Sequence, residues 1–151
     1  MTLLRTVSDT GACPPRAGSA IVRDIGYPTA AARAAALARL RKLCLALPET
    51  TERLSHGAPT FFIRGKTSFL ILLDNHHGDG RFAIWCAAEP GTQEALVAGD
   101  PDRFFRPPYV GHRGWLGVML HGRVDWDDVA GIAEDAFCAV APKKLVDELG
   151  R

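Results

Sequence analysis

The sequence lacks the short motifs that mark most nucleotide-binding and hydrolytic sites. None of the patterns GxGxxG, GxxxxGK followed by Ser or Thr, HExxH or GxSxG occurs in its 151 residues. It therefore carries no local signature of a dinucleotide-binding fold, a phosphate-binding loop, a zinc protease or an α/β hydrolase. No serine or cysteine stands in a motif that identifies a nucleophile. We expect a protein that is not an enzyme and that holds no cofactor.

The sequence also lacks an excess of charge of either sign. Its 18 lysines and arginines nearly balance its 17 aspartates and glutamates. A near-neutral chain produces no overall field that would steer it toward nucleic acid or an anionic membrane surface. Any basic contact surface must therefore be a local one.

Cysteines are few, and long hydrophobic runs are absent. The 4 cysteines do not have the spacing of a zinc site, and three of them lie in apolar runs. This pattern is typical of small buried side chains in a reducing compartment rather than of a disulfide framework. No run approaches the ~18 apolar residues of a membrane-spanning helix, and the N-terminal residues contain no apolar core of a signal peptide. We expect a cytoplasmic protein with no membrane partner.

Length and composition fit a single domain that follows a leader. A chain of 151 residues with 47% hydrophobic residues can bury one core. Residues 1–27 are rich in small and turn-forming residues and show no sustained hydrophobic period, which is typical of a flexible N-terminal leader. We expect the folded domain to occupy residues 28–151.

The period of the apolar residues divides this domain into helices and short strands. Thr29 as N-cap and Pro48 as a stop predict a helix that ends near residue 47, and Asp125 predicts the start of a second long helix, which ends near residue 141. Between them, only Gly65-Lys66 separates two apolar runs, a spacing typical of a hairpin. The expected strands are residues 52–55, 60–64, 67–73, 81–87 and 115–120, and the expected short helices are residues 91–97 and 143–149.

This order of elements predicts an α+β fold. Residues 60–87 leave no room for the crossover helices that a parallel, doubly wound sheet would need. The first four strands are therefore expected to form an antiparallel meander. Helices should pack against one face of the resulting antiparallel sheet.

One segment, residues 104–120, combines aromatic rings, cations and turn residues ahead of an apolar strand. The surrounding stretch from Arg103 to Arg123 contains four arginines and no acidic residue. Guanidinium groups can pair with phosphates while flat rings stack on bases, although the rings can equally pack over the sheet and leave the cations solvated. The candidate contact residues are Arg106, Tyr109, His112, Arg113 and Trp115, with Arg64 and Lys66 added if the first hairpin turn lies on the same side.

A second loop, residues 74–81, concentrates side chains that can bind a metal ion. These side chains are Asp74, His76, His77 and Asp79. Adjacent histidines point in different directions on an extended chain, however, and the spacing of an EF-hand is absent. We interpret the loop as an exposed turn whose glycines supply positive φ angles, and we expect no metal site.

Several short motifs, taken in order, resemble those of the MmcQ/YjbR-like family. The resemblance covers about residues 30–149 and implies an α+β fold with a CyaY-like antiparallel sheet in a double-wing DNA-binding arrangement. It assigns no chemical roles, but Lys66, Arg81, Tyr109, Gly111 and Trp115 match motif positions. The motifs are residues 56–62 (HGAPTFF), 65–66 (GK), 79–81 (DGR), 107–111 (PPYVG) and 114–115 (GW), followed by a helix and residues 142–145 (PKKL).

Two functions from different classes remain open. In the first, the protein is a DNA-binding module whose hairpin turns act as wings, with Arg64, Lys66, Arg106 and Arg113 on phosphates and Tyr109 or Trp115 near bases. In the second, it binds a small molecule or an anion in a pocket formed by Tyr109, His112, Arg113 and Trp115. A protein-interaction module using the same surface is a weaker third hypothesis.

Overall fold

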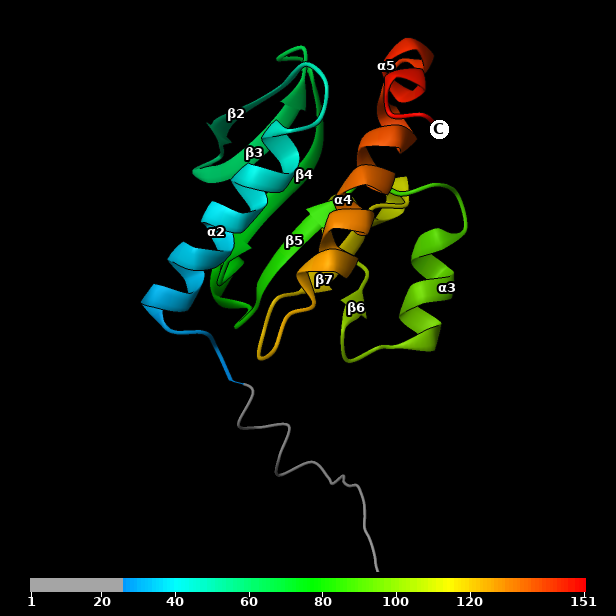
Figure 1. Cartoon of the computed structure of the whole chain (residues 1–151). Coiled ribbons are helices and arrows are strands. Elements are labelled where there is room, and N and C mark those ends of the chain that lie inside the picture. Colours follow the sequence, from blue (N-terminus) through cyan, green and yellow to red (C-terminus); the bar gives the residue numbers. More distant parts are fainter. Residues whose placement is uncertain (1–25) are drawn as a thin grey trace, which may run out of the picture.

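The computed structural model describes residues 26–151, which form a six-stranded antiparallel sheet with helices on one face (Figure 1). The strand order is β2-β3-β4-β5-β7-β6. The strands are β2 (Thr50–Ser55), β3 (Ala58–Ile63), β4 (Thr67–Asp74), β5 (Phe82–Cys86), β6 (Phe104–Phe105) and β7 (Leu116–Met119). The helices are α2 (Ala30–Leu45), α3 (Thr92–Gly99), α4 (Trp126–Val140) and α5 (Lys143–Glu148), with 3₁₀ turns η2 (His76–Gly78) and η3 (Gly111–Arg113).

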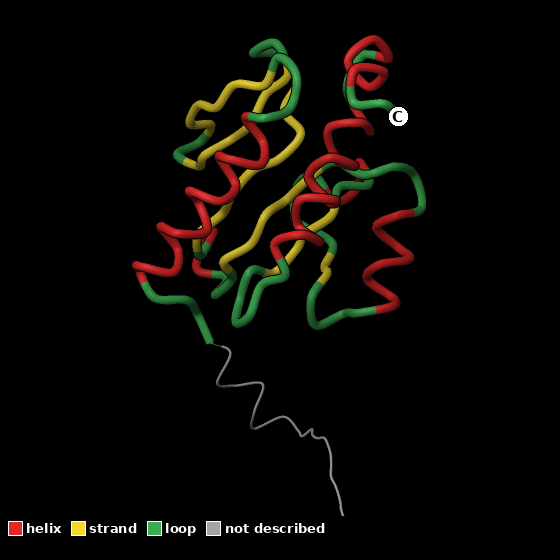
Figure 2. Tube along the Cα trace, in the orientation of Figure 1, coloured by secondary structure: helices red, strands yellow, loops and turns green. Residues whose placement is uncertain are grey.

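The predicted α+β fold and the antiparallel meander β2-β3-β4-β5 are confirmed. Helices α2 and α4 lie next to each other over one face of the sheet, and α3 lies beside the β6 edge (Figures 1 and 2). The two-residue strand β6 was not predicted, because two phenylalanines followed by prolines give no alternating pattern. The predicted leader lies outside the described residues except at its end.

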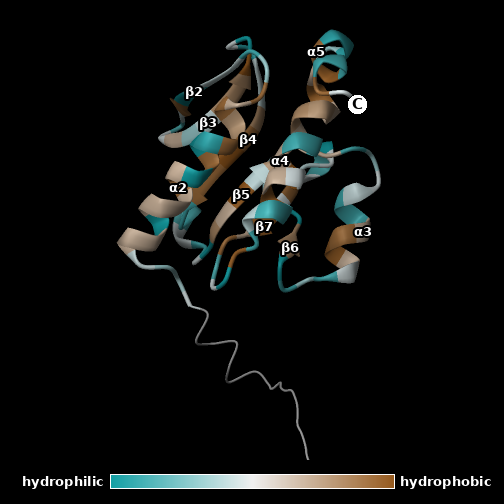
Figure 3. Ribbon diagram, viewed as in Figure 1, coloured by the Kyte–Doolittle hydropathy of each residue, from teal (hydrophilic) through white to brown (hydrophobic). Residues whose placement is uncertain are grey.

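Both long helices begin where the sequence predicts. The Thr29 hydroxyl accepts a hydrogen bond from the Ala32 backbone N–H at 3.1 Å, and the Asp125 carboxylate accepts from two backbone N–H groups of the first turn of α4. The faces that these helices turn inward cover apolar strands, among them β4 and β5 (Figure 3). The buried helix residues are Ala36, Leu40 and Cys44 on α2 and Val129, Ala133, Ala136 and Phe137 on α4.

A β-bulge in β4 helps the sheet to meet α4. Phe61 pairs with Leu70 whereas Phe62 pairs with Ser68, so Phe69 is an extra residue in its strand. The Phe69 ring packs edge-on against Phe137 of α4, with 5.6 Å between the ring centroids.

The thiols of the core are unpaired. Cys44 and Cys86 are buried and free, and burial raises the pKa of each to about 12. At neutral pH both are therefore uncharged thiols that act as small apolar side chains. Cys13 lies outside the described residues.

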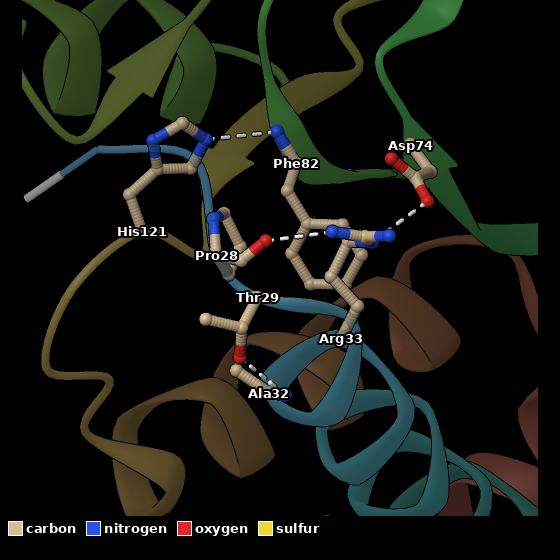
Figure 4. Close-up of polar contacts among 7 residues, drawn as sticks. All are labelled: Pro28, Thr29, Ala32, Arg33, Asp74, Phe82 and His121. Carbon is tan, nitrogen blue, oxygen red and sulfur yellow. Dashed lines mark hydrogen bonds and ion pairs between the residues drawn. The ribbon is translucent and has the colours of Figure 1, made fainter.

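The chain ahead of α2 is fixed to one end of the sheet (Figure 4). The Tyr27 ring packs edge-on against Phe82 and His121, and the Arg33 guanidinium lies 5.2 Å from the Tyr27 ring centroid. Arg33 also donates to the Pro28 carbonyl at 2.7 Å and pairs with Asp74 at 3.1 Å. Helix α2, the start of the described chain and the end of β4 are thus joined through one arginine.

Replacing His121 with alanine should lower the melting temperature. The Phe82 backbone N–H donates to His121 Nε2 at 2.9 Å, and the variant would leave this N–H without its acceptor and remove the ring that supports Tyr27. An unsatisfied buried donor costs ~1–3 kcal/mol. Thermal unfolding followed by circular dichroism should show the loss, while His112→Ala, at an exposed position, should leave the melting temperature unchanged. Equal melting temperatures for the two variants would contradict this role of His121.

Candidate functional site

One face of the sheet carries neither α2 nor α4, and we call it the open face. Successive side chains along a strand point to opposite faces of the sheet, so one residue of known orientation shows which face each of its strand neighbours occupies. Glu52 of β2 pairs with Arg41 of α2 at 2.8 Å, so the next residue, Arg53, points to the open face. The cross-strand pairs extend this assignment to every strand of the described sheet.

A row of paired residues runs across the open face through all six strands, and we call it the central row. Because paired residues in adjacent strands share a face, one arginine fixes the orientation of the other five positions. The row contains the buried Trp85 and ends at Phe105 on the far edge. In strand order its members are Arg53, Thr60, Ile71, Trp85, Gly117 and Phe105.

An arginine lies on a phenylalanine ring at each end of the open face. The Arg53 guanidinium is 3.6 Å from the Phe62 ring centroid, and Arg81 is 4.0 Å from that of Phe105. Arg53 also donates to the Gly65 carbonyl at 2.9 Å. Within residues 26–151, neither side chain forms an ion pair with a carboxylate. Stacking on a ring holds each guanidinium in place and leaves its N–H edge available to an anion.

Acidic side chains of the strands point away from this surface. The six described strands contain two carboxylates, Glu52 and Asp74, and each pairs with an arginine of α2. In the β4–β5 loop, the Asp79 carboxylate accepts a hydrogen bond from the Arg81 backbone N–H at 2.9 Å. The open face is therefore positively charged although the whole chain is nearly neutral.

Four aromatic side chains meet over the middle of the open face, and we call them the ring cluster. The His76 ring lies edge-on to Trp85 at 5.1 Å between centroids, and the Tyr109 ring lies edge-on to both His76 and His77 at 6.1 Å. The members come from β5, the β4–β5 loop and the β6–β7 loop. Trp85 is 4% exposed beneath them, whereas Tyr109 is 68% exposed.

The ring cluster is held by an unusual backbone. His77 and Tyr109 have φ angles of +53° and +67°, in the left-handed region that side-chain-bearing residues seldom adopt. Gly78 and Gly80 have φ angles of +73° and +72°, as the sequence predicts for this exposed loop. In the part of the chain that the structure describes, no group of three or more metal-ligating side chains is close enough to hold an ion.

The β6–β7 loop is held in place from inside by Gln93 of α3, which is 3% exposed. Its amide Nε2 donates to the carbonyl of Gly111 at 2.9 Å and to that of Trp115 at 2.5 Å, and its Oε1 accepts from Arg106 at 3.4 Å. Arg106 lies so close to Gly111 that a Cβ atom there would come within 2.6 Å of the arginine side chain. Arg106 therefore helps to shape the loop.

The remaining predicted contact residues differ in their surroundings. Trp115 is 3% exposed and belongs to the core, with the Arg113 guanidinium 5.4 Å from its ring centroid, so the packing alternative holds for this residue. His112 and Arg113 are exposed. At the β3–β4 turn, Arg64 pairs with Glu49 at 2.8 Å and by its hydrogen bond lowers the pKa of that carboxyl, whereas Lys66 is exposed.

The predicted residues thus fall into separate groups. Tyr109 and Arg81 join the open face, while Arg106, His112 and Arg113 surround a cavity of about 280 Å³ beside α3 that Tyr109 and Trp115 do not line. Sequence reasoning missed Arg53, Gln93 and the contact between His76 and Trp85. An alternating strand pattern could have suggested Arg53, but no local signal marks Gln93.

The fold and these motifs can now be compared with known proteins. Residues 45–139, more than half of the chain, match the family model described as YjbR. The chain belongs to the YjbR family. No curated protein matches this YjbR-family chain. In residues 26–151, none of the helices has the length and apolar character to cross a membrane.

A solved structure shares the fold of this YjbR-family protein. It is the crystal structure of the Deinococcus radiodurans protein DR2400, with the domain DUF419. The two chains align with a TM-score of 0.59 and 19% sequence identity, over 76% of this chain and 87% of the other. At this identity the likeness establishes the α+β fold alone.

Proposed function

We propose that this YjbR-family protein is a non-enzymatic DNA-binding protein and that the open face of its sheet is the contact surface. The observation that carries the proposal is the pair of ring-stacked arginines, Arg53 and Arg81, which lack carboxylate partners within the described residues. The free thiols of the core suit the cytoplasm, where we place this function.

Phosphate is the group that this pair fits best. A guanidinium presents several N–H donors in one plane and can donate two parallel hydrogen bonds to phosphate oxygens. Most protein–DNA hydrogen bonds go to the phosphate–sugar backbone and position the protein without reading sequence. Lys66 lies next to Gly65, whose carbonyl holds Arg53, and so extends the positive surface toward the β3–β4 turn.

The test is binding of fluorescein-labelled oligonucleotides followed by anisotropy at several salt concentrations. Affinity should fall steeply with salt, because each neutralised phosphate releases condensed counterions. The double variant Arg53→Ala/Arg81→Ala should bind about 100-fold more weakly at low salt, since a hydrogen bond to a charged group contributes ~1.5–3 kcal/mol.

The matched control is Arg39→Ala. Arg39 also stacks on an aromatic ring, that of Trp126 at 5.6 Å, but it belongs to α2 on the other side of the sheet. Compared with each single change, Arg53→Ala or Arg81→Ala, the control removes the same charge and the same type of contact, so it should leave affinity near that of the unmodified protein. Absence of saturable binding by the unmodified protein, or equal losses in both variants, would overturn the proposal.

A second candidate function is binding of a small anion in the cavity beside α3. Arg106, His112 and Arg113 line this cavity of about 280 Å³, together with Glu94. Its size is near the lower limit of ligand pockets, ~300 Å³. A thermal-shift screen of nucleotides and phosphorylated metabolites tests it: a ligand that raises the melting temperature of the unmodified protein but not of Arg113→Ala would support this function.

A further inference from the structure

We propose that the open face binds single-stranded nucleic acid, with an unpaired base stacked on Tyr109 of the ring cluster. This inference rests on the proposed function and names its ligand class. It depends on three features of the described residues: the width of the sheet, the exposure of Tyr109 and the strained backbone that holds the rings.

The width of the open face argues against insertion into a duplex groove. The central row spans six strands and therefore five inter-strand spacings of ~4.8 Å, about 24 Å in all. The major groove of B-form DNA is ~12 Å wide and admits a helix or a two-stranded ribbon. A six-stranded face is about twice as wide as this groove and cannot enter it as a whole.

A flexible single strand can instead lie over the side chains that cover the central row, whose members Thr60, Trp85 and Phe105 are themselves buried. The ring-stacked arginines stand near the two ends of the row, and Trp85 occupies its fourth position, about 14 Å from Arg53 when counted in strand spacings. Phosphates at the ends and a base in the middle are compatible with one short stretch of strand. Positive grooves that carry aromatic rings are the common means of binding single strands.

Tyr109 is the ring that can accept the base. Its contacts with His76 and His77 are edge-on, with interplanar angles of 88° and 74°, and the side chain is 68% exposed. The histidines therefore contact the tyrosine ring while most of its side chain stays exposed. Within the duplex, base faces are stacked on one another, so stacking on Tyr109 requires an unpaired base.

The backbone of the two loops fixes where the rings lie. Non-glycine residues in the left-handed region cost of order 1–3 kcal/mol each, and such strain gathers at binding sites. Both loops that meet over Trp85 contain such residues, Asn75 and His77 in one and Tyr109 in the other; in the described chain Glu49, His56 and Arg64, in the links before β2, β3 and β4, have them too. The chain thus keeps an unfavourable conformation at the two points that bring the rings together.

The experiment compares Tyr109→Ala with Tyr109→Phe in the full chain. Anisotropy is measured on a labelled thymidine oligonucleotide of about 12 residues, within the usual ~4–16 nucleotide site sizes, on the same strand annealed to its complement, and on a uridine oligonucleotide. Tyr109→Ala should weaken single-strand binding about tenfold or more, whereas Tyr109→Phe keeps the ring and should bind normally. The thymidine and uridine strands show whether the ligand is DNA or RNA.

The salt dependence separates stacking from phosphate contacts. Tyr109→Ala should leave the slope of log affinity against log salt unchanged, while Arg53→Ala should reduce it by ~0.7 on a single strand. Duplex binding that equals or exceeds single-strand binding, together with full affinity of Tyr109→Ala, would overturn this inference and leave the proposed DNA-binding function standing. No binding to any of the three oligonucleotides would overturn both.

Discussion

Replacing Gly117 with valine should lower the free energy of unfolding by ~3 kcal/mol or more. Gly117 lies in the central row opposite Phe105, and a Cβ atom built on it would collide with the Phe105 ring. The Phe105 ring lies so close to the Gly117 Cα that only the glycine hydrogen fits between them. Overpacking of this kind typically costs ~1–3 kcal/mol for modest insertions, and valine adds three carbons at the tightest point.

Denaturant unfolding measures this effect, and the chain offers a control of opposite sign. Gly131 lies exposed within α4 with no atom near its would-be Cβ, so Gly131→Ala should stabilise by ~0.5–1 kcal/mol. Phe105→Ala combined with Gly117→Val should be less destabilised than the two single changes predict, because the smaller side chain makes room. If the losses of stability in the two single variants simply added up in the double variant, the collision with Phe105 would not be the cause of the Gly117→Val effect.

Replacing Gln93 with leucine should also lower the free energy of unfolding, by ~2–4 kcal/mol. The change keeps most of the side-chain volume but removes the donor that serves the carbonyls of Gly111 and Trp115. A buried acceptor left without its partner costs ~1–3 kcal/mol. Arg106 would also lose its contact with the Gln93 carbonyl oxygen.

Hydrogen exchange locates the consequence of the Gln93 change. The amides of the β6–β7 loop, residues 106–115, should exchange faster in Gln93→Leu, and Tyr109 should lose its fixed position beside the histidines. Ala98→Leu is the control, because Ala98 belongs to the same helix, is exposed and does not line the cavity beside this loop. Unchanged exchange in the loop, with stability lost elsewhere, would show that Gln93 does not hold it.

The sequence by itself determined the features that depend on neighbours along the chain. Thr29 and Asp125 cap helices whose apolar stripes follow the helical period, so the helices appear where predicted. The short links between strands leave antiparallel pairing as the only connection that they can make, which determines the meander. The family motifs could be recognised in the sequence for the same reason, because each is a short contiguous segment.

The candidate site depended on contacts between residues that are distant in sequence. The sequence shows aromatic rings at 85 and 109 and cations at 53 and 81. The strand register places Arg53 and Trp85 on one face, and loop contacts bring Arg81 over Phe105 and Tyr109 beside His76. Burial likewise separates Trp115, which packs into the core, from Tyr109, which is 68% exposed only six residues earlier. Local patterns set the helices, strands and turns, whereas cross-strand pairing and the Gln93 hydrogen bonds, which join positions far apart in the chain, decided which side chains form a surface.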